Sequence, residues 1–143
     1  MNIYKNEYWV YYETKKMQKL EKNVGKWIIG YNLKDSEWAI SLCTKVIENE
    51  IISSVKHTNP NVENFYNSGV ICFYLELEDK EGHRRLLDFL IKNKAISINK
   101  NGLYKNIAFK QDEQTSKNEY GEDFKASLNL KDFVDLNTGK LTV

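Results

Sequence analysis

In the first part of the chain, hydrophobic and polar residues alternate in short runs of the kind that forms β-strands. The first run, EYWVYYE at 7–13, is aromatic and β-branched in its middle, which favours a strand. Alternation places Trp9 and Tyr11 on the face of this strand opposite to Tyr12, so we expect both faces to be partly covered. A second run at 26–31 predicts the next strand.

Two later segments repeat their apolar residues every three or four positions, which predicts amphipathic helices. The first covers 36–49 and has Trp38, Leu42 and Val46 on one face. The second covers 80–94 and has a leucine-rich face. Each is preceded by an aspartate, a residue that caps helix N-termini well. Both helices need an apolar surface to cover, and one face of a sheet supplies it.

Further strands are expected between and after the helices, at 51–57, 70–77, 95–98, 103–110 and near 124–130. Polar segments at 58–68 and 111–123 are expected to form loops. The resulting order is two strands, a helix, two strands, a helix and three strands, which favours an α+β fold. We expect a curved, mostly antiparallel sheet with two main helices packed on one face, in a single domain over 1–143.

Length and composition fit this single domain and argue against several classes of protein. The 143 residues suffice for one hydrophobic core. A net charge of +1 gives no overall field for DNA or RNA, which argues against general nucleic-acid binding. No stretch has the length and apolar character of a membrane span or a signal peptide. Cys43 and Cys72 are too few for a disulfide scaffold or a metal cluster, so we expect a cytoplasmic protein with reduced thiols and no bound metal.

The succession of these elements resembles a known family. Its motifs are the strands EYWVYYE, GKWIIGY and GVICFYLELED, the tryptophan-bearing helix DSEWAISLCTKVIENE and the segment YKNIAFKQDEQT. Together they are similar to the phosphothreonine lyase domain family, which is related to the basophilic leukaemia expressed protein, and they cover roughly residues 7–121. The resemblance implies the fold of the cap-binding translation initiation factor.

The same resemblance implies roles for the tryptophans. In the cap-binding factor, two tryptophans outside these motifs hold the methylated base, whereas those of the second strand and the following helix pack in the core. Trp27 and Trp38 match the packing positions, so we expect both in the core. Trp9 alone cannot form a two-sided clamp. Nucleotide or RNA binding is therefore an alternative that rests on fold similarity alone.

An enzymatic alternative is a phosphothreonine lyase or another phosphoryl-directed activity. Such a lyase removes an α-proton with a base, usually lysine, and assists phosphate departure with an acid, usually histidine. Lys56 and His57 are the candidates, with Lys110 or Lys105 as a replacement base. Adjacent side chains of a strand point to opposite faces, so Lys56 and His57 share a pocket only if the strand ends or bulges there.

The tripeptide HRR that opens the second helix is the best local candidate for binding a phosphorylated ligand. A helix N-terminus attracts anions, and the arginine fork suits phosphate. Arg84 and Arg85, together with Lys110, would hold such a ligand. The competing interpretation is a first turn of exposed residues, some of them paired with Asp88 or Glu81.

The leading interpretation is a small non-catalytic binding protein that engages a protein partner. The sequence has no usable catalytic constellation and no Gly-rich phosphate loop, and we expect no cofactor. Aromatic residues would form the interface: Trp9, Tyr11, Phe65 and Tyr66. Arginine occurs at only two positions while lysine, asparagine and isoleucine are abundant, as in AT-rich bacterial or phage genomes. We therefore expect a mobile-element protein that inhibits a host system, such as an anti-CRISPR.

Overall fold

The computed structural model describes residues 1–62, 67–112 and 126–142, which contain a seven-stranded antiparallel sheet and two α-helices. The strand order across the sheet is β1-β2-β4-β5-β3-β6-β7. The longest strands, β3 and β5, pair along their whole length near its centre. In chain order the strands are β1 (Asn2–Lys5), β2 (Trp9–Glu13), β3 (Val24–Asn32), β4 (Ser54–Thr58), β5 (Ser68–Glu76), β6 (Ala108–Gln111) and β7 (Leu128–Asn129).

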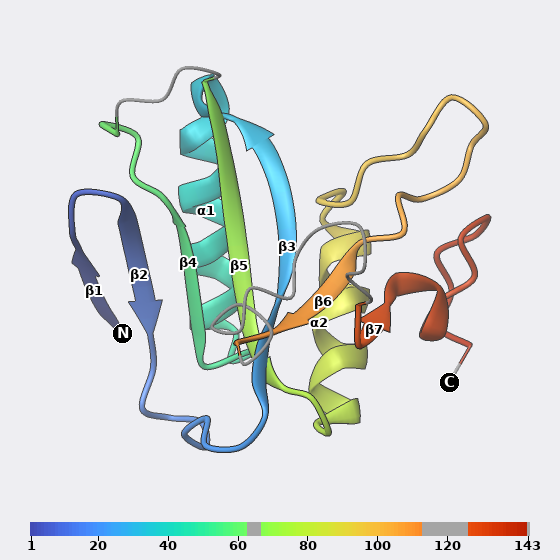
Figure 1. Ribbon diagram of the computed structural model, residues 1–143, viewed down its shortest axis with the longest axis horizontal. Coiled ribbons are helices and arrows are strands. Elements are labelled where there is room, and N and C mark those ends of the chain that lie inside the picture. The colour runs from blue at the N-terminus through green and yellow to red at the C-terminus, as the bar shows by residue number, and fades with distance from the viewer. Residues whose placement is uncertain (63–66, 113–125, 143) are drawn as a thin grey trace.

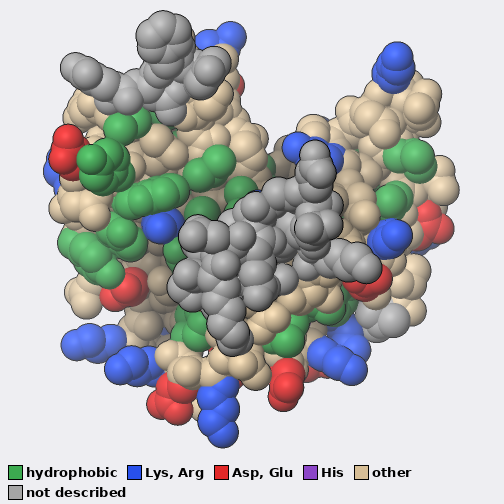
Figure 2. All heavy atoms as spheres, in the orientation of Figure 1, with side chains coloured by type: hydrophobic (Ala, Val, Ile, Leu, Met, Phe, Trp, Pro, Cys, Tyr) green, Lys and Arg blue, Asp and Glu red, His purple; other side chains and the backbone are tan. Residues whose placement is uncertain are grey.

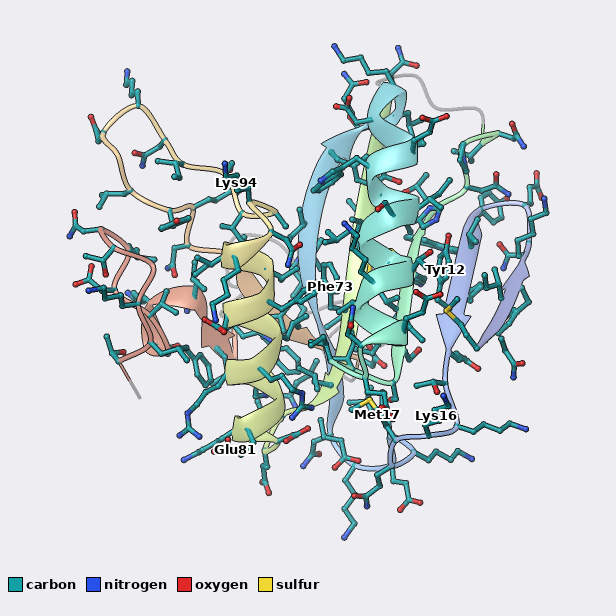
Figure 3. All side chains as sticks on the ribbon, turned by 180° about the vertical axis from the view of Figure 1, so that it is seen from behind. Tyr12, Lys16, Met17, Phe73, Glu81 and Lys94 are labelled. Atoms are coloured by element: carbon teal, nitrogen blue, oxygen red, sulfur yellow. The ribbon has the colours of Figure 1, made fainter. Side chains whose placement is uncertain are left out.

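Both helices cover the same face of the sheet, behind it in Figure 1 and in front of it in the reverse view of Figure 3. Helix α1 (Ser36–Glu48) follows the short 3-10 turn η1 (Leu33–Asp35). Helix α2 (Lys80–Lys92) is capped by Asp79, whose carboxylate accepts a hydrogen bond from the first turn. A second 3-10 turn, η2 (Leu130–Asp132), follows β7. Neither helix combines the length and apolar character needed to cross a membrane. The expected α+β fold is confirmed.

The hydrophobic core lies between the sheet and the two helices. Trp27 of β3, Phe73 of β5 and Phe109 of β6 are fully buried in it, together with Val46 of α1 and Leu86 of α2. Removing a side chain of this size from water contributes about 1.5–3 kcal/mol. Successive side chains of a strand alternate between its two faces. The neighbours of Trp27, Phe73 and Phe109 along their strands therefore point to the face of the sheet that α1 and α2 leave uncovered.

The structure differs from the predicted strands at both ends of the chain. Strand β1 was not predicted, and it forms a hairpin with β2 at one edge of the sheet. The predicted strands at 95–98 and 103–110 reduce to an isolated bridge and β6. The side chain of Asn99 accepts two backbone N–H groups of the intervening turn, so this segment satisfies its polar groups locally rather than through the sheet. Within the described residues, the predicted strand near 124–130 is only β7.

The prediction that Trp27 and Trp38 both lie in the core is wrong for Trp38. Its side chain keeps 36% of its surface exposed, whereas Trp27 is completely buried. Helix α1 turns Leu42, Cys43 and Val46 towards the sheet, so the apolar stripe is centred beyond its first turn. Trp38 therefore lies at the margin of the helix–sheet contact.

Candidate functional site

The face of the sheet that α1 and α2 do not cover, called the open face below, gathers aromatic and basic side chains from five strands. Figure 2 shows hydrophobic side chains over β1, β2 and β4 with a basic side chain among them. The register explains the grouping, because Tyr4 pairs with Tyr11, Tyr11 with Lys56, and Lys26 with Tyr74. The members used below are Tyr4, Trp9, Tyr11, Lys26, Lys56 and Tyr74.

Lys56 of β4 is at the centre of this group. Its Nζ lies 3.8 Å from the ring centroid of Trp9, 5.7 Å from that of Tyr11 and 5.8 Å from that of Tyr74. A cation over an aromatic face is attracted to the negative charge of the ring. Lys56 is half-buried, and burial is the largest cause that lowers the pKa of its amine; the charge of Lys26 acts in the same direction.

The remaining aromatic rings of the open face are held by each other and by charged neighbours. Tyr4 and Tyr11 stack with centroids 4.8 Å apart and ring planes 10° from parallel. The Tyr4 hydroxyl donates to Glu13 over 2.6 Å, and this bond is the main cause that raises the pKa of Tyr4 to about 12. On the other side of the group, Lys26 Nζ lies 5.8 Å from the centroid of Tyr74. The same ammonium forms an ion pair with Asp112 over 3.3 Å.

The two histidines belong to the opposite, covered face and are completely buried. His57 accepts from the Tyr12 hydroxyl at Nε2, 2.9 Å away, and its Nδ1–H donates to the Thr58 carbonyl over 2.8 Å. His83 repeats the pattern: Nδ1 accepts from the indole N–H of Trp27 over 3.0 Å, and Nε2–H donates to the Leu77 carbonyl over 2.9 Å. Burial lowers the pKa of both imidazoles, which keeps them neutral.

The residues considered for a lyase, Lys56, His57 and Lys110, do not lie on the same face of the sheet. Lys56 lies on the open face and His57 is buried on the covered face, so strand β4 does not bulge to bring the two side chains together. Lys110 pairs in register with Lys26 and alternates with the buried Phe109, which places it on the open face with Lys56. The only candidate acid of the set is therefore on the wrong side of the sheet and is fully engaged in hydrogen bonds.

The three residues of the HRR tripeptide lie in different surroundings and do not form one site. His83 is buried against Trp27 and Phe109, which corrects the interpretation of three exposed residues in a first turn. Arg84 forms an ion pair with Glu81, as that interpretation expected. Arg85 donates from Nε to the Ile51 carbonyl over 2.8 Å. Both arginines are on α2, on the covered side of the sheet, so they do not share a site with Lys110 on the open face.

The two cysteines are buried, and burial raises the pKa of both thiols, which disfavours the reactive thiolate. Cys43 faces the core from α1, and Cys72 is on β5 opposite Lys56. Over the described ranges of the chain, no group of three or more histidine, cysteine, aspartate and glutamate side chains is placed to hold a metal ion.

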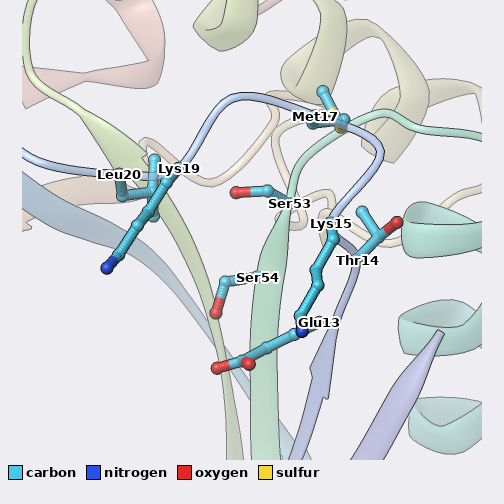
Figure 4. A pocket seen from close by; sticks show the side chains of 8 residues that line it. All are labelled: Glu13, Thr14, Lys15, Met17, Lys19, Leu20, Ser53 and Ser54. Atoms are coloured by element: carbon cyan, nitrogen blue, oxygen red, sulfur yellow. The ribbon is translucent and has the colours of Figure 1, made fainter.

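An open pocket of about 490 Å³ adjoins one end of the open face. Figure 4 shows its lining, which comes from the end of β2, the connection that follows and the start of β4. Glu13 and Ser54 face each other in register there and continue the rows of Tyr11 and Lys56. The lining residues are Glu13, Thr14, Lys15, Met17, Lys19, Leu20, Ser53 and Ser54. The lining presents hydroxyl, amine and carboxylate groups beside the apolar side chains of Met17 and Leu20, and it continues the contact surface of the open face.

Part of this site is predicted by the sequence. Trp9 and Tyr11 are expected to bind a partner and Lys56 and Lys110 to have other roles, and only the structure brings the two sets together. Tyr4, Lys26 and Tyr74 are not predicted, although the alternation of 70–77 could have placed Tyr74 opposite the core. Phe65 and Tyr66, also named for partner binding, lie outside the residues that the structure describes.

Comparisons with known proteins gave no match to a family model, a curated protein or a solved structure. The resemblance to the phosphothreonine lyase domain family and to the cap-binding factor therefore stays a prediction.

Proposed function

We propose that this protein is a non-catalytic binding module that engages a protein partner through the open face. The observation that carries the proposal is the gathering of Trp9, Tyr11 and Tyr74 around Lys56 on the sheet face opposite to α1 and α2 (Figure 1). Tryptophan and tyrosine are the residues that most often dominate the binding energy of protein interfaces. They contribute large contact area and lose little conformational freedom on binding.

The same features favour a protein over single-stranded nucleic acid. Bases bind to sheet surfaces by stacking on exposed ring faces. Here the ring of Trp9 is engaged by the ammonium of Lys56, and the ring of Tyr11 stacks on Tyr4. The net charge of +1 adds no general attraction for a polyanion. The lyase alternative gains no support either, because Lys56 and His57 are on opposite faces.

An affinity capture from the native host with matched tryptophan variants tests the proposal. Trp9→Ala removes a ring of the open face, and Trp38→Ala removes a partly exposed ring from α1 on the opposite side. We expect a stoichiometric protein partner that Trp38→Ala retains, whereas Trp9→Ala loses about tenfold or more in affinity. Retention by Trp9→Ala and Tyr11→Ala alike would contradict the proposal.

The narrower interpretation, an anti-CRISPR-like inhibitor of a host system encoded by a mobile element, rests on composition. Its expected outcome in the same experiment is a captured subunit of a host defence complex whose activity falls when the protein is added. A captured partner with no role in defence would remove this subtype and leave the binding function intact.

A further inference from the structure

Lys56 differs from the other described lysines of the open face in how its charge is compensated. Lys26 pairs with the carboxylate of Asp112. Among the described residues, no carboxylate lies within ion-pair distance of Lys56, although the charge of Asp112 acts on it, and its ammonium lies over three aromatic rings. A half-buried charge without a counter-ion is costly in free energy, and ring contacts recover only part of that loss.

The surroundings of Lys56 bring a second ammonium group, that of Lys26, and the carboxylate of Asp112 that acts on Lys56 is already paired with Lys26. Lys26 and Lys56 approach the ring of Tyr74 from neighbouring strands, each with Nζ 5.8 Å from its centroid. Around Tyr74, the ammonium groups of Lys26 and Lys56 thus share the carboxylate of Asp112 among the described side chains that these contacts involve. A partner that complements this surface must bring negative charge to its centre.

Apolar surface surrounds the same point. Trp9 and Tyr11 are half-buried and lie on one side of Lys56, and Tyr74 lies on the other. The approaching group is therefore expected to be a single acidic side chain between apolar ones, since a uniformly charged segment would leave the rings without contacts.

We propose that the protein partner docks an aspartate or glutamate on Lys56, with flanking apolar side chains packed on Trp9 and Tyr11. The inference rests on the proposed binding function and specifies the chemistry of its partner. Bringing a carboxylate to Lys56 supplies the counter-ion that the described part of the chain does not, in a site that binding shields further from water. Such a charge pair contributes to specificity as well as to affinity.

A displayed library of random linear peptides, selected on the whole protein, tests this proposal without knowledge of the natural partner. We expect enriched peptides to carry aspartate or glutamate next to apolar residues. Lys56→Met should weaken them by about tenfold or more, and Lys45→Met, at an exposed position of α1, should not. Replacing the peptide carboxylate by its amide should cause a similar loss in the wild type and almost no further loss in Lys56→Met.

The results that would overturn the proposal also show whether the binding function stands without it. Peptides that depend on Trp9 and Tyr11 but bind Lys56→Met as well as wild type would leave the binding function standing and remove acid recognition. Enriched peptides that ignore Trp9, Tyr11 and Lys56 alike, or no enriched peptide, would remove both. A short oligouridylate that binds more tightly than any peptide, in a Lys56-dependent way, would assign the face to nucleic acid. Circular dichroism of each variant confirms that it is folded.

Discussion

On the covered face of the sheet, the indole N–H of Trp27 donates to His83 and the hydroxyl of Tyr12 donates to His57, and all four side chains are buried. On the open face, aromatic rings of the same kinds contact lysine ammonium groups and are only half-buried. The basic groups of the two faces differ accordingly. The histidines have internal partners for both ring nitrogens, whereas Lys56 has no carboxylate within ion-pair distance among the described residues.

The difference separates aromatic residues that build the fold from those available for recognition. A buried polar group that is fully hydrogen-bonded fixes one arrangement of the core and offers nothing to a ligand. A half-buried charge beside rings gains from a further partner. Substitutions matched across the two faces therefore should affect stability on one side and binding on the other.

The largest expected effect is the loss of Trp27. Trp27→Ala deletes a completely buried ring and leaves Nδ1 of His83 without its donor. The free energy of unfolding should fall by about 3–5 kcal/mol. Trp9→Ala, on the open face, should lower it by about 1 kcal/mol. Urea titrations followed by circular dichroism measure both, and equal losses would remove the distinction between the faces.

Glycines of β3 give a second matched pair. A Cβ at Gly25 would lie 2.6 Å from both the Lys110 carbonyl oxygen and the Phe109 ring, so Gly25→Ala forces β6 to move. This overpacking should lower the free energy of unfolding by about 1–3 kcal/mol. A Cβ at Gly30 meets nothing closer than the Gly69 carbonyl at 3.9 Å. Gly30→Ala should therefore leave stability unchanged or slightly raised, and a loss equal to that of Gly25→Ala would contradict this packing.

Removing a tyrosine hydroxyl compares the faces more finely. Tyr12→Phe leaves Nε2 of the buried His57 without its donor, which should lower the free energy of unfolding by about 1–3 kcal/mol. Tyr4→Phe removes an exposed hydrogen bond to Glu13, and the change should stay within about 0.5 kcal/mol. Chemical denaturation of the two variants measures both changes in the free energy of unfolding. If Tyr12→Phe is as stable as wild type, the hydrogen bond to His57 does not support the core.

The smallest effect is a pH dependence that comes from the covered face. Burial lowers the pKa of His57 and His83 below the value of 6.5 expected in the unfolded chain. Below that pH the unfolded state binds protons that the folded state does not, so stability is complete above it and is lost as pH falls through the folded pKa values. From about pH 7.5 to about pH 6.0, we expect each histidine to cost up to about 1 kcal/mol.

Denaturant titrations at the two pH values measure this loss, and His57→Gln provides the control. The glutamine amide can accept from Tyr12 and donate to the Thr58 carbonyl without titrating in this range. The variant should therefore retain only the part of the pH dependence that His83 supplies. An unchanged pH dependence in His57→Gln would show that His57 does not contribute to it.

The sequence predicted the elements best where one strong pattern repeats over many positions. Helix α2 has both its capping aspartate and its leucine-rich face in the sequence, and it begins where expected at Lys80. Prediction failed where a local pattern competes with tertiary contacts. Trp38 fits the apolar stripe of α1 but lies at the edge of the sheet contact. His83 reads as an exposed residue of a basic tripeptide, and only the position of Trp27 makes a partner for it inside the core.

The sequence by itself determined that this chain forms an α+β fold and that Trp9 and Tyr11 share one face of their strand, because both follow from the periodicity of its residues. Only the tertiary structure decided which strands lie side by side. The order β2-β4-β5-β3 places Lys56 between Tyr11 and Cys72, and Lys26 beside Tyr74, across long separations in sequence. The pairing of distant strands depends on their register and on the face of the sheet that the helices cover. Neither can be predicted from the residues of one segment alone. The open face and its central lysine are products of that pairing.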